Sequence, residues 1–226
     1  MIDQIFRKYN PEYKHRWEVY NTILKDSISK DTIWLDIGCG KNEHVAELGK
    51  NAKKAMGIDI LDDNNRVNAP FLQSDLRNIP LPSGYANLIT LRMVVEHLEK
   101  VPEDFSEIRR LLAHEGKLII LTTNSLSPVI FLPRILPHRL KSWVIQKIFS
   151  VDSHEIFPTY HRFNTPHKMA KGFPEMTLQK IEYLEIVPLD KPLMALIFGF
   201  WYNLTKISVL KHFRSNLLSV FQKIPA

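Results

Sequence analysis

Short apolar runs and helically spaced apolar positions alternate along the first half of the chain. Each run is only a few residues long, as expected for a strand buried on both faces. The runs lie at residues 32–38, 54–60, 85–93 and 117–123, and a third, shorter element leads into Asp75. Residues 42–50 and 102–113 have the pattern of helices. Strands that alternate with helices at this interval predict a parallel sheet with right-handed crossovers.

Both ends of the chain add predicted elements to this pattern. Residues 12–28 are expected to form an amphipathic helix, because four large side chains recur there at spacings of four, three and four. These side chains are Tyr13, Trp17, Tyr20 and Leu24. Strand character returns at residues 177–187 and 216–223, and residues 192–211 between them are expected to be helical.

The rhythm is interrupted between Asn124 and the later strands. Prolines surround one predicted helix at residues 138–149, so residues 125–172 read as an insertion and not as another strand–helix unit. The chain shows no internal repeat or linker. It is therefore expected to form one domain over residues 1–226, with the insertion as its appendage.

Composition limits the class of protein. With 226 residues, 45% of them hydrophobic, the chain can bury an ordinary globular core. Cys39 is the only cysteine, which excludes an intramolecular disulfide and favours a reducing compartment. The opening MIDQIFRKYN is too polar for a signal peptide, and no apolar stretch reaches the roughly 20 residues that span a bilayer. We expect a cytoplasmic protein.

The net charge of +6 is unevenly distributed. Residues 126–150 and 191–226 contain cations but no acidic side chain, while the rest of the chain is slightly acidic. Within these windows, residues 129–149 and the basic apolar helical segment 192–214 combine large apolar residues with cations only. Such segments favour the surface of an anionic membrane, which predicts peripheral attachment at its inner face. The alternative is that they pack together or form a dimer interface.

Candidate chemistry begins at WLDIGCGKNEH, residues 34–44. Gly38 and Gly40 lie between a predicted strand and a predicted helix, where glycine lets the backbone turn sharply and approach a ligand. The helix N-terminus beyond the turn favours a carboxylate or a phosphate. Alone, this turn is equally compatible with an ordinary strand–helix connection.

Two carboxylates downstream strengthen the case for a ligand. Asp59 ends the second predicted strand some 20 residues beyond the glycines, where it can accept hydrogen bonds from both hydroxyls of a ribose. Asp75 follows the third short element at the same edge of the sheet, where it could accept from an adenine amino group.

Taken in order, LDIGCG, GIDI, SDLRNIPLPSGYANLI, EHL and EIRRLLAHEGKLII resemble the motifs of small-molecule class I S-adenosylmethionine-dependent methyltransferases. The resemblance covers residues 33–123. It implies a Rossmann-like α/β fold, with a seven-stranded, mostly parallel sheet, helices on both faces and an inserted helical lid. It implies S-adenosylmethionine as the cofactor and the following contacts: Asp36, Gly38 and Gly40 at the methionine end, Asp59 and Ile60 at the ribose, Asp75 and the Leu76 backbone at the adenine, and Arg92 and Met93 on the reactive side.

The chain departs from the family pattern at one position. The family usually has a third glycine two places after Gly40, where this chain has Asn42. Asparagine tolerates left-handed backbone angles, so we expect altered packing of the loop with cofactor binding retained. A dinucleotide dehydrogenase would need glycine at position 43, which is Glu43, and an acidic side chain there would crowd a pyrophosphate.

His97 is the candidate general base. It follows the fourth predicted strand near the expected methyl group, and histidine titrates near neutral pH. The alternative is a structural role in the turn. Since alignment of the reactants supplies about 7–11 kcal/mol and a general base only about 10²- to 10⁴-fold in rate, alignment dominates and methyl transfer does not require the base.

The acceptor is the least determined part of the prediction. Tyr160, His161 and Arg162 lie in FPTYHRFNTPHKM, a segment of the insertion that resembles the lid of methyltransferases acting on glycans and lipids. We expect a small-molecule, glycan or lipid-linked acceptor, methylated at a hydroxyl or ring position. An RNA methyltransferase or a non-catalytic binding protein are the alternatives, although the cations lie among aliphatic residues and no base-gripping motif is present. No metal site and no nucleic-acid partner are predicted, and the oligomeric state is left open.

Overall fold

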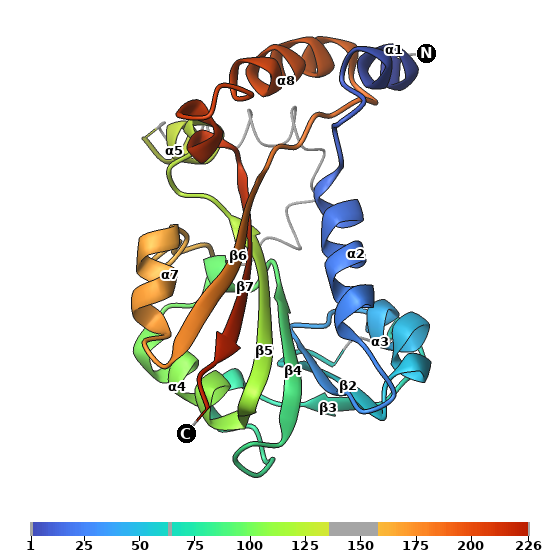
Figure 1. Cartoon of the computed structure of the whole chain (residues 1–226), viewed down its shortest axis with the longest axis vertical. Coiled ribbons are helices and arrows are strands. Elements are labelled where there is room, and N and C mark those ends of the chain that lie inside the picture. The colour runs from blue at the N-terminus through green and yellow to red at the C-terminus, as the bar shows by residue number, and fades with distance from the viewer. Residues whose placement is uncertain (1, 63–64, 136–157, 226) are drawn as a thin grey trace.

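The computed structural model describes residues 2–62, 65–135 and 158–225, which form a central sheet with helices on both faces (Figure 1). The strands are β1 (Ile33–Ile37), β2 (Lys54–Asp59), β3 (Phe71–Gln73), β4 (Ala86–Arg92), β5 (Leu112–Thr123), β6 (Met176–Leu184) and β7 (Asn216–Lys223). The helices are α1 (Ile2–Tyr9), α2 (Arg16–Ser27), α3 (Glu43–Leu48), α4 (Val101–Leu111), α5 (Pro128–Ile135), α7 (Pro166–Gly172) and α8 (Pro192–Leu204). The helix predicted at 138–149, and with it most of the segment 129–149, lies outside the described residues.

The seven strands are ordered β3-β2-β1-β4-β5-β7-β6. Strands β1 to β5 pair in parallel, and β7 is inserted antiparallel between β5 and β6. The predicted seven-stranded, mostly parallel sheet is therefore confirmed. Because β1, β4 and β2 are parallel neighbours, the loops that follow them emerge at one edge of the sheet.

One strand begins earlier than its apolar run. The sequence predicts a helix to residue 113 and a strand from residue 117, but α4 ends at Leu111 and β5 begins at Leu112. Leu112 pairs with Ala86, and the register between β4 and β5 shifts after that pair. Pairing across this irregularity draws the residues before the apolar run into the sheet.

The N-terminal region differs from the prediction in a second way. The helix expected over 12–28 begins only at Arg16, where the side chain of His15 accepts a hydrogen bond from the Trp17 amide at 3.4 Å. Tyr20 and Leu24 are buried as the spacing predicts, but Tyr13 lies before the helix and packs elsewhere. A further helix, α1, precedes it and has no counterpart in the predicted pattern.

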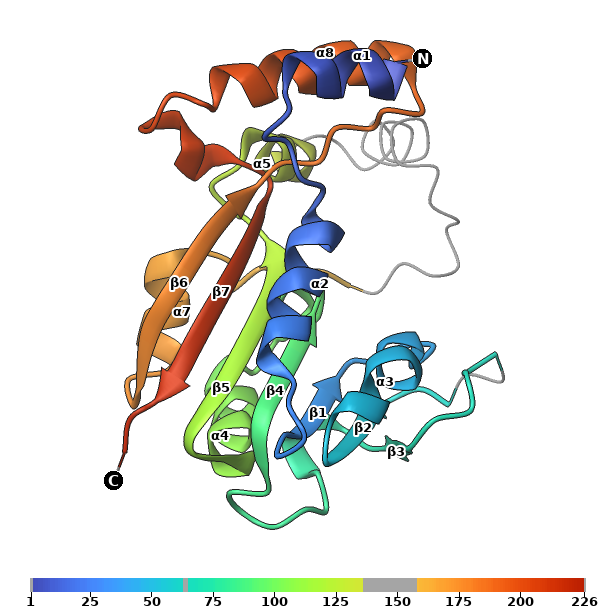
Figure 2. The ribbon, with the colours of Figure 1, turned by 45° about the vertical axis from the view of Figure 1, so that its right-hand side comes forward.

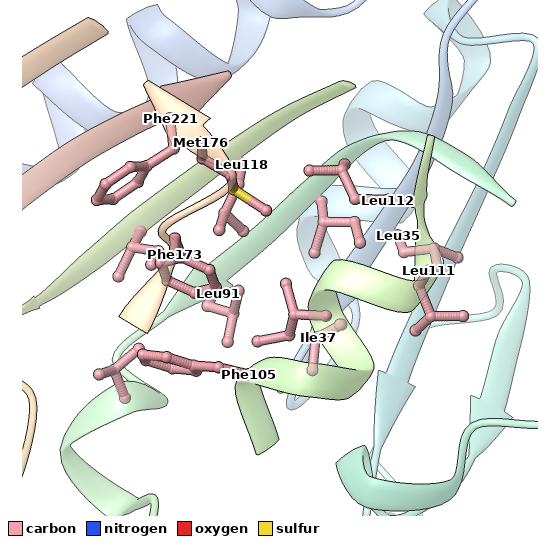
Figure 3. Packing of buried hydrophobic residues seen from close by; sticks show 14 of the residues in the cluster. Leu35, Ile37, Leu91, Phe105, Leu111, Leu112, Leu118, Phe173, Met176 and Phe221 are labelled. Carbon is pink, nitrogen blue, oxygen red and sulfur yellow. The ribbon is translucent and has the colours of Figure 1, made fainter. Parts of the chain in front are cut away.

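Two apolar clusters fill the two sides of the sheet. On the α4 side, Phe105 stacks on Phe173 with ring centres 4.3 Å apart, and residues of β1, β4 and β5 complete this cluster (Figure 3). On the α2 side, Tyr20 and Leu24 pack with Trp34 and with residues of β5 and β7. Alternate side chains of each strand thus enter opposite clusters.

A small separate layer lies beyond the sheet, where α8 runs beside α1 (Figure 2). We call α1, α8 and residues 205–213 the cap. The rings of Phe6, Tyr13 and Tyr202 meet in pairs with centres 5.1 to 5.8 Å apart and hold the two helices together. Among the described helices, none has both the length and the apolar character needed to span a bilayer.

Candidate functional site

The turn after β1 requires glycine at its first position. Gly38 has a φ of 72°, and a Cβ there would lie 2.2 Å from Cγ2 of Val94. Its amide donates to the carbonyl of Ile58 at 2.7 Å, which ties the turn to β2. The chain therefore turns close to Val94, just beyond the end of β4, and presents main-chain atoms instead of a side chain at position 38.

Asn42 occupies the left-handed conformation predicted for it, with φ 61° and ψ 22°, at the residue before α3. The residue is fully buried, and its Nδ2 donates to the carbonyl of Pro70 at 3.1 Å. Its Oδ1 lies where a Cβ on Gly57 would come within 2.1 Å. Asn42 thus joins the turn to β2 and to the connection that leads into β3.

Asp59 closes the turn from the second strand. Its Oδ2 accepts from the Gly40 amide at 2.9 Å, and its Oδ1 accepts from the Leu61 amide at 3.1 Å. A carboxylate oxygen has two lone pairs, so each oxygen retains capacity for a further donor such as a hydroxyl. The backbone thereby fixes the carboxylate at the end of β2.

Asp75 precedes a short 3-10 helix, η2 (Leu76–Asn78), and is engaged by one neighbour. Its Oδ1 accepts from the amide and Nε of Arg77 at 2.9 and 3.0 Å, and Oδ2 accepts from the same guanidinium. These bonds hold the pKa of Asp75 near 2, well below its usual range. A ligand amino group would share this carboxylate with Arg77.

The predicted cofactor residues largely converge on one cavity of about 570 Å³. Its wall combines the glycine turn, the ends of β2 and β4, the start of η2 and the segment that follows residue 157. The predicted residues in the wall are Gly38, Gly40, Asp59, Ile60, Asp75, Leu76, Met93, His97 and Tyr160. Ser74, Arg77, Glu99, Lys100 and Asp104 also line it and were not predicted.

Asp36 does not reach this wall but lies buried behind it. Its Oδ1 accepts from Oγ1 of Thr90 at 2.6 Å, and Thr90 in turn accepts from the indole of Trp34 at 2.8 Å. Its Oδ2 is buried and has no hydrogen-bond partner among the described residues. Burial raises the pKa of Asp36 to about 6, which favours the neutral acid over the carboxylate.

Arg92 also lies outside the wall, for a reason set by strand geometry. Leu91 enters the cluster on the α4 side, so Arg92 faces the α2 side, where its guanidinium lies 5.5 Å from the Trp17 ring centre. Met93, with a φ of 59°, turns back into the wall. Of the two residues predicted at the end of this strand, only Met93 faces the cavity.

Arg16 is a residue of this region that the sequence did not single out. Its Nη1 donates to Oδ1 of Asn216 at 2.8 Å and lies 3.8 Å from the sulfur of Met93, and its Nε has no hydrogen-bond partner in the described part of the chain. Burial lowers the pKa of Arg16 to about 10. In the sequence, Arg16 stands out only as a charged residue at the start of an apolar helical pattern. Its hydrogen-bond partner Asn216 is 200 residues away, so the local sequence does not indicate their contact.

Residues 158–161 of the predicted insertion are tied to the loop after β4. The amides of Tyr160 and His161 both donate to the carbonyl of Glu96, at 2.8 and 3.1 Å. Nδ1 of His97 donates to the carbonyl of Pro158 at 2.9 Å, since a carbonyl can only accept. The loop and the insertion therefore form one edge of the cavity.

The other two predicted acceptor residues do not line the wall. Nδ1 of His161 lies 3.0 Å from Oγ1 of Thr123 at the end of β5. The guanidinium of Arg162 lies 4.0 Å from Oε1 of Glu99, with both side chains more than half exposed. Only Tyr160 of the predicted trio lines the cavity.

A buried network supports this edge from below. Oε2 of Glu96 accepts from Oγ1 of Thr122 at 2.7 Å, and Nδ2 of Asn164 donates to the same hydroxyl at 2.6 Å. Burial raises the pKa of Glu96. The network joins the loop after β4, the end of β5 and the insertion.

Comparison with known families and structures adds independent findings. A family described as "Methyltransferase domain" matches residues 7–167. A sequence search of curated proteins found no match.

Solved structures share the fold at low sequence identity. The PH0226 protein of Pyrococcus horikoshii OT3 is 17% identical, with a TM-score of 0.61 over 92% of this chain and 89% of that one. An S-adenosylmethionine-dependent methyltransferase of Mesorhizobium loti is 13% identical, with a TM-score of 0.55 over 87% and 93%. The geranyl diphosphate C-methyltransferase of Streptomyces coelicolor A3(2), solved with S-adenosyl-L-homocysteine, is 13% identical, with a TM-score of 0.58 over 92% and 78%.

Proposed function

Because the chain belongs to the methyltransferase domain family and uses S-adenosylmethionine, we propose that it methylates a small-molecule, glycan or lipid-linked acceptor at a hydroxyl or ring position. The observation that carries the proposal is the shared wall of the cavity. This cavity of about 570 Å³ is lined by the glycine turn, by the carboxylate of Asp59 and by the candidate base His97. When bound there, the sulfonium supplies an activated methyl group.

The residues of the wall fit the cofactor chemically. Nothing lies within 4 Å of a Cβ placed on Gly40, so this part of the turn is open to a ligand. Asp59 is held by two amides and can accept from the two ribose hydroxyls, while Asp75 and the backbone of Leu76 take the adenine. Ile60 packs beside the ribose position.

Two buried groups are assigned to the methionine end. Arg16 lies behind the wall beside Met93, and we assign it to the carboxylate because its Nε has no partner among the described residues. Asp36, whose Oδ2 likewise has none, is assigned to the ammonium group, whose positive charge would favour the carboxylate form of this buried acid. A charge-assisted hydrogen bond to a bound ligand would satisfy each of these groups. Arg92, predicted on the reactive side, lies on the α2 face beside Trp17 and is assigned no contact with the cofactor.

His97 is assigned the role of base for a hydroxyl acceptor. With its proton on Nδ1 bound to the Pro158 carbonyl, the lone pair of the neutral ring is on Nε2. The residue lines the cavity, and Nε2 can accept the proton that a hydroxyl loses as its oxygen is methylated. Tyr160 covers the acceptor, with His161 and Arg162 behind it, as part of the lid predicted for the insertion at 125–172, of which residues 136–157 lie outside the described part of the chain.

The test is an acceptor screen with radiolabelled cofactor and separated lipid, glycan, RNA and metabolite fractions of the source cells. We expect label in the lipid, glycan or metabolite fraction. Label in RNA alone would replace the proposed acceptor class by the RNA alternative. Cofactor binding without label in any fraction would support a non-catalytic binding protein.

A second test concerns the base. His97→Asn keeps a donor near the Pro158 carbonyl but removes Nε2, so kcat for a hydroxyl acceptor should fall by about 10²- to 10⁴-fold with little change in KM for the cofactor. A kcat within tenfold of the wild type would assign His97 a positioning role only.

A further inference from the structure

The outward face of α8 is apolar from residue 193 to residue 200. Its positions 193, 196, 197 and 200 follow helical spacing and carry leucine, leucine, isoleucine and phenylalanine. Leu196 is 72% exposed and Phe200 is 71% exposed. Beyond the helix, Ile207 and Val209 extend this surface, and Val209 is 71% exposed. A contiguous apolar face of this kind marks an interaction site.

This face is not the side on which α8 packs. Ala195, Phe198, Gly199 and Tyr202 point inward and are buried. Phe6 of α1 approaches Gly199 so closely that a Cβ there would lie 3.2 Å from its ring. The helix is therefore fixed by its inner face, and the outer apolar side chains add nothing to that packing.

The charges around the face are mostly positive. The described residues 191–225 include no aspartate or glutamate, and the cations near the face are Lys191, Lys206, Lys211 and Arg214, while α1 carries one acidic residue, Asp3, which pairs with Arg7 at 2.8 Å. Lys206 pairs with Glu12 at 2.7 Å, whereas Lys8 and Lys211 form no ion pair in the described part of the chain. Tyr9, 73% exposed on α1, adds an aromatic side chain beside Lys8. Apolar, aromatic and cationic groups in this combination match the interface of an anionic bilayer.

The sheet topology places this surface at the carboxyl ends of the parallel strands, where the cavity lies. Segment 185–215, which contains α8, connects the end of β6 to the start of β7, where Asn216 pairs with Thr123 at the end of β5. The cap therefore lies at the carboxyl end of β5, the same end at which the cavity opens beside β4 (Figure 2).

We propose that the outer face of α8, with residues 205–213 and α1, docks on an anionic phospholipid bilayer. Leu193, Leu196, Ile197 and Phe200 enter the interface while Lys8 and Lys211 remain at the headgroups. Resting on the proposed function, the inference narrows the acceptor to a membrane-borne molecule presented at the carboxyl end of the sheet. With 13 residues, α8 lies in the plane of the membrane and does not cross it.

A second copy of the chain is a poorer occupant of this surface. A two-fold interface brings the same patch of each copy together, so the cations of one rim would meet those of the other. An anionic lipid surface instead attracts each of these cations, and each lysine raises the affinity for the membrane about fivefold.

The test is co-sedimentation of the full chain with vesicles of phosphatidylcholine alone or mixed equally with phosphatidylglycerol. We expect binding to the anionic vesicles at low salt and release as salt is raised. The double variant Leu196→Gln/Phe200→Gln should weaken binding by at least about a hundredfold, because each large side chain entering the interface contributes about tenfold or more. Lys8→Gln/Lys211→Gln should weaken it by about 25-fold.

Ile224→Gln is the matched control, since Ile224 is 50% exposed but lies near the C-terminus at the opposite end of the molecule (Figure 1). It should bind vesicles like the wild type. Cofactor affinity, measured by calorimetry on every variant, separates the two proposals. Wild-type protein that binds S-adenosylmethionine but stays in the supernatant overturns the membrane inference alone, and label confined to a water-soluble acceptor overturns the acceptor assignment.

A dimer would also be visible in the same series. If analytical ultracentrifugation shows a dimer that Leu196→Gln/Phe200→Gln dissociates, and no vesicle binding accompanies it, the face is an interface between copies and the membrane inference is wrong.

Discussion

The cavity wall and the cap lie at the same end of the sheet but hold their distinctive side chains in opposite ways. In the wall, Asp59 is fixed by two backbone amides, and position 38 has no room for a side chain beside Val94. In the cap, Leu196 and Phe200 project into solvent from a helix that is already packed on its other side. Internal contacts explain the residues of the wall, whereas those of the outer cap are explained only by something outside the chain. Substitutions in the two regions should therefore affect different measurements.

The largest effect is expected at the ribose position of the wall. Asp59→Ala should raise the Kd for S-adenosylmethionine by at least about 100-fold, since it removes two hydrogen bonds to a charged acceptor at about 1.5–3 kcal/mol each. Calorimetric titration measures this directly. Asp62→Ala is the control, because Asp62 is exposed in the same loop and pairs with Arg66. An unchanged affinity in Asp59→Ala would show that the ribose assignment is wrong.

The next effect concerns the buried carboxyl behind the wall. Burial raises the pKa of Asp36 from 3.8 to about 6, so the folded state holds this proton more tightly than the unfolded state. Its contribution to stability is present below about pH 4 and is lost as pH rises through about 6, a difference of about 3 kcal/mol. Asp36→Asn should remove this part of the pH dependence, as measured by urea unfolding of the cofactor-free protein at pH 4 and pH 7. Parallel profiles for variant and wild type would contradict it.

A smaller effect should separate the two glycines of the turn. Gly38→Ala places a Cβ 2.2 Å from Val94 at a φ of 72°, whereas Gly40→Ala meets nothing within 4 Å at a φ of 54°. Both variants bear the backbone cost, but only the first adds a clash of about 1–3 kcal/mol. The difference between their free energies of unfolding isolates that clash. Equal destabilisation would mean that Val94 moves aside freely.

The smallest effect is expected in the cap. Leu196→Gln/Phe200→Gln should change the free energy of unfolding in buffer by no more than about 0.5 kcal/mol per site, because exposed side chains away from internal contacts have little influence on folding. Urea unfolding without vesicles measures it. A loss of several kcal/mol would show that the outer face contributes to the fold and that the contrast between the two regions is false.

The sequence predicted those parts of the fold whose pattern is local. Short apolar runs marked the parallel strands, and the change of rhythm after Asn124 separated the insertion from the sheet. Helix α1 was not predicted because its pattern of apolar and polar residues is mixed. Its apolar contact in the cap is made by Phe6 with Tyr202, which is almost 200 residues away in the sequence. Tertiary contact, and not local periodicity, determines that element.

For the functional site, too, the residues predicted from the sequence are those whose position depends on local pattern and not on distant contacts. Asp59 and Asp75 were predicted because the first ends a strand and the second follows shortly after one, and both line the cavity, while their contacts with the cofactor remain predictions. Asp36 and Arg92 were assigned to the ligand side, but strand alternation turns them toward the α2 face of the sheet. Arg16 could not be found from its neighbours in sequence, because its surroundings are formed by Met93 and Asn216.

The pairing of Asn42 with Gly57 has a consequence for the family pattern. Glycine at position 42 would suit the left-handed backbone, but it would remove the donor that Pro70 receives and leave empty the space that the amide fills beside Gly57. Conversely, a side chain at position 57 cannot be accommodated while the amide is present. The effects of positions 42 and 57 on stability are therefore coupled. Replacing Asn42 by glycine, which gives the triple-glycine loop, should destabilise the chain unless position 57 is changed as well. Placing the Asn42 loop in a relative with a side chain at position 57 should likewise destabilise that protein.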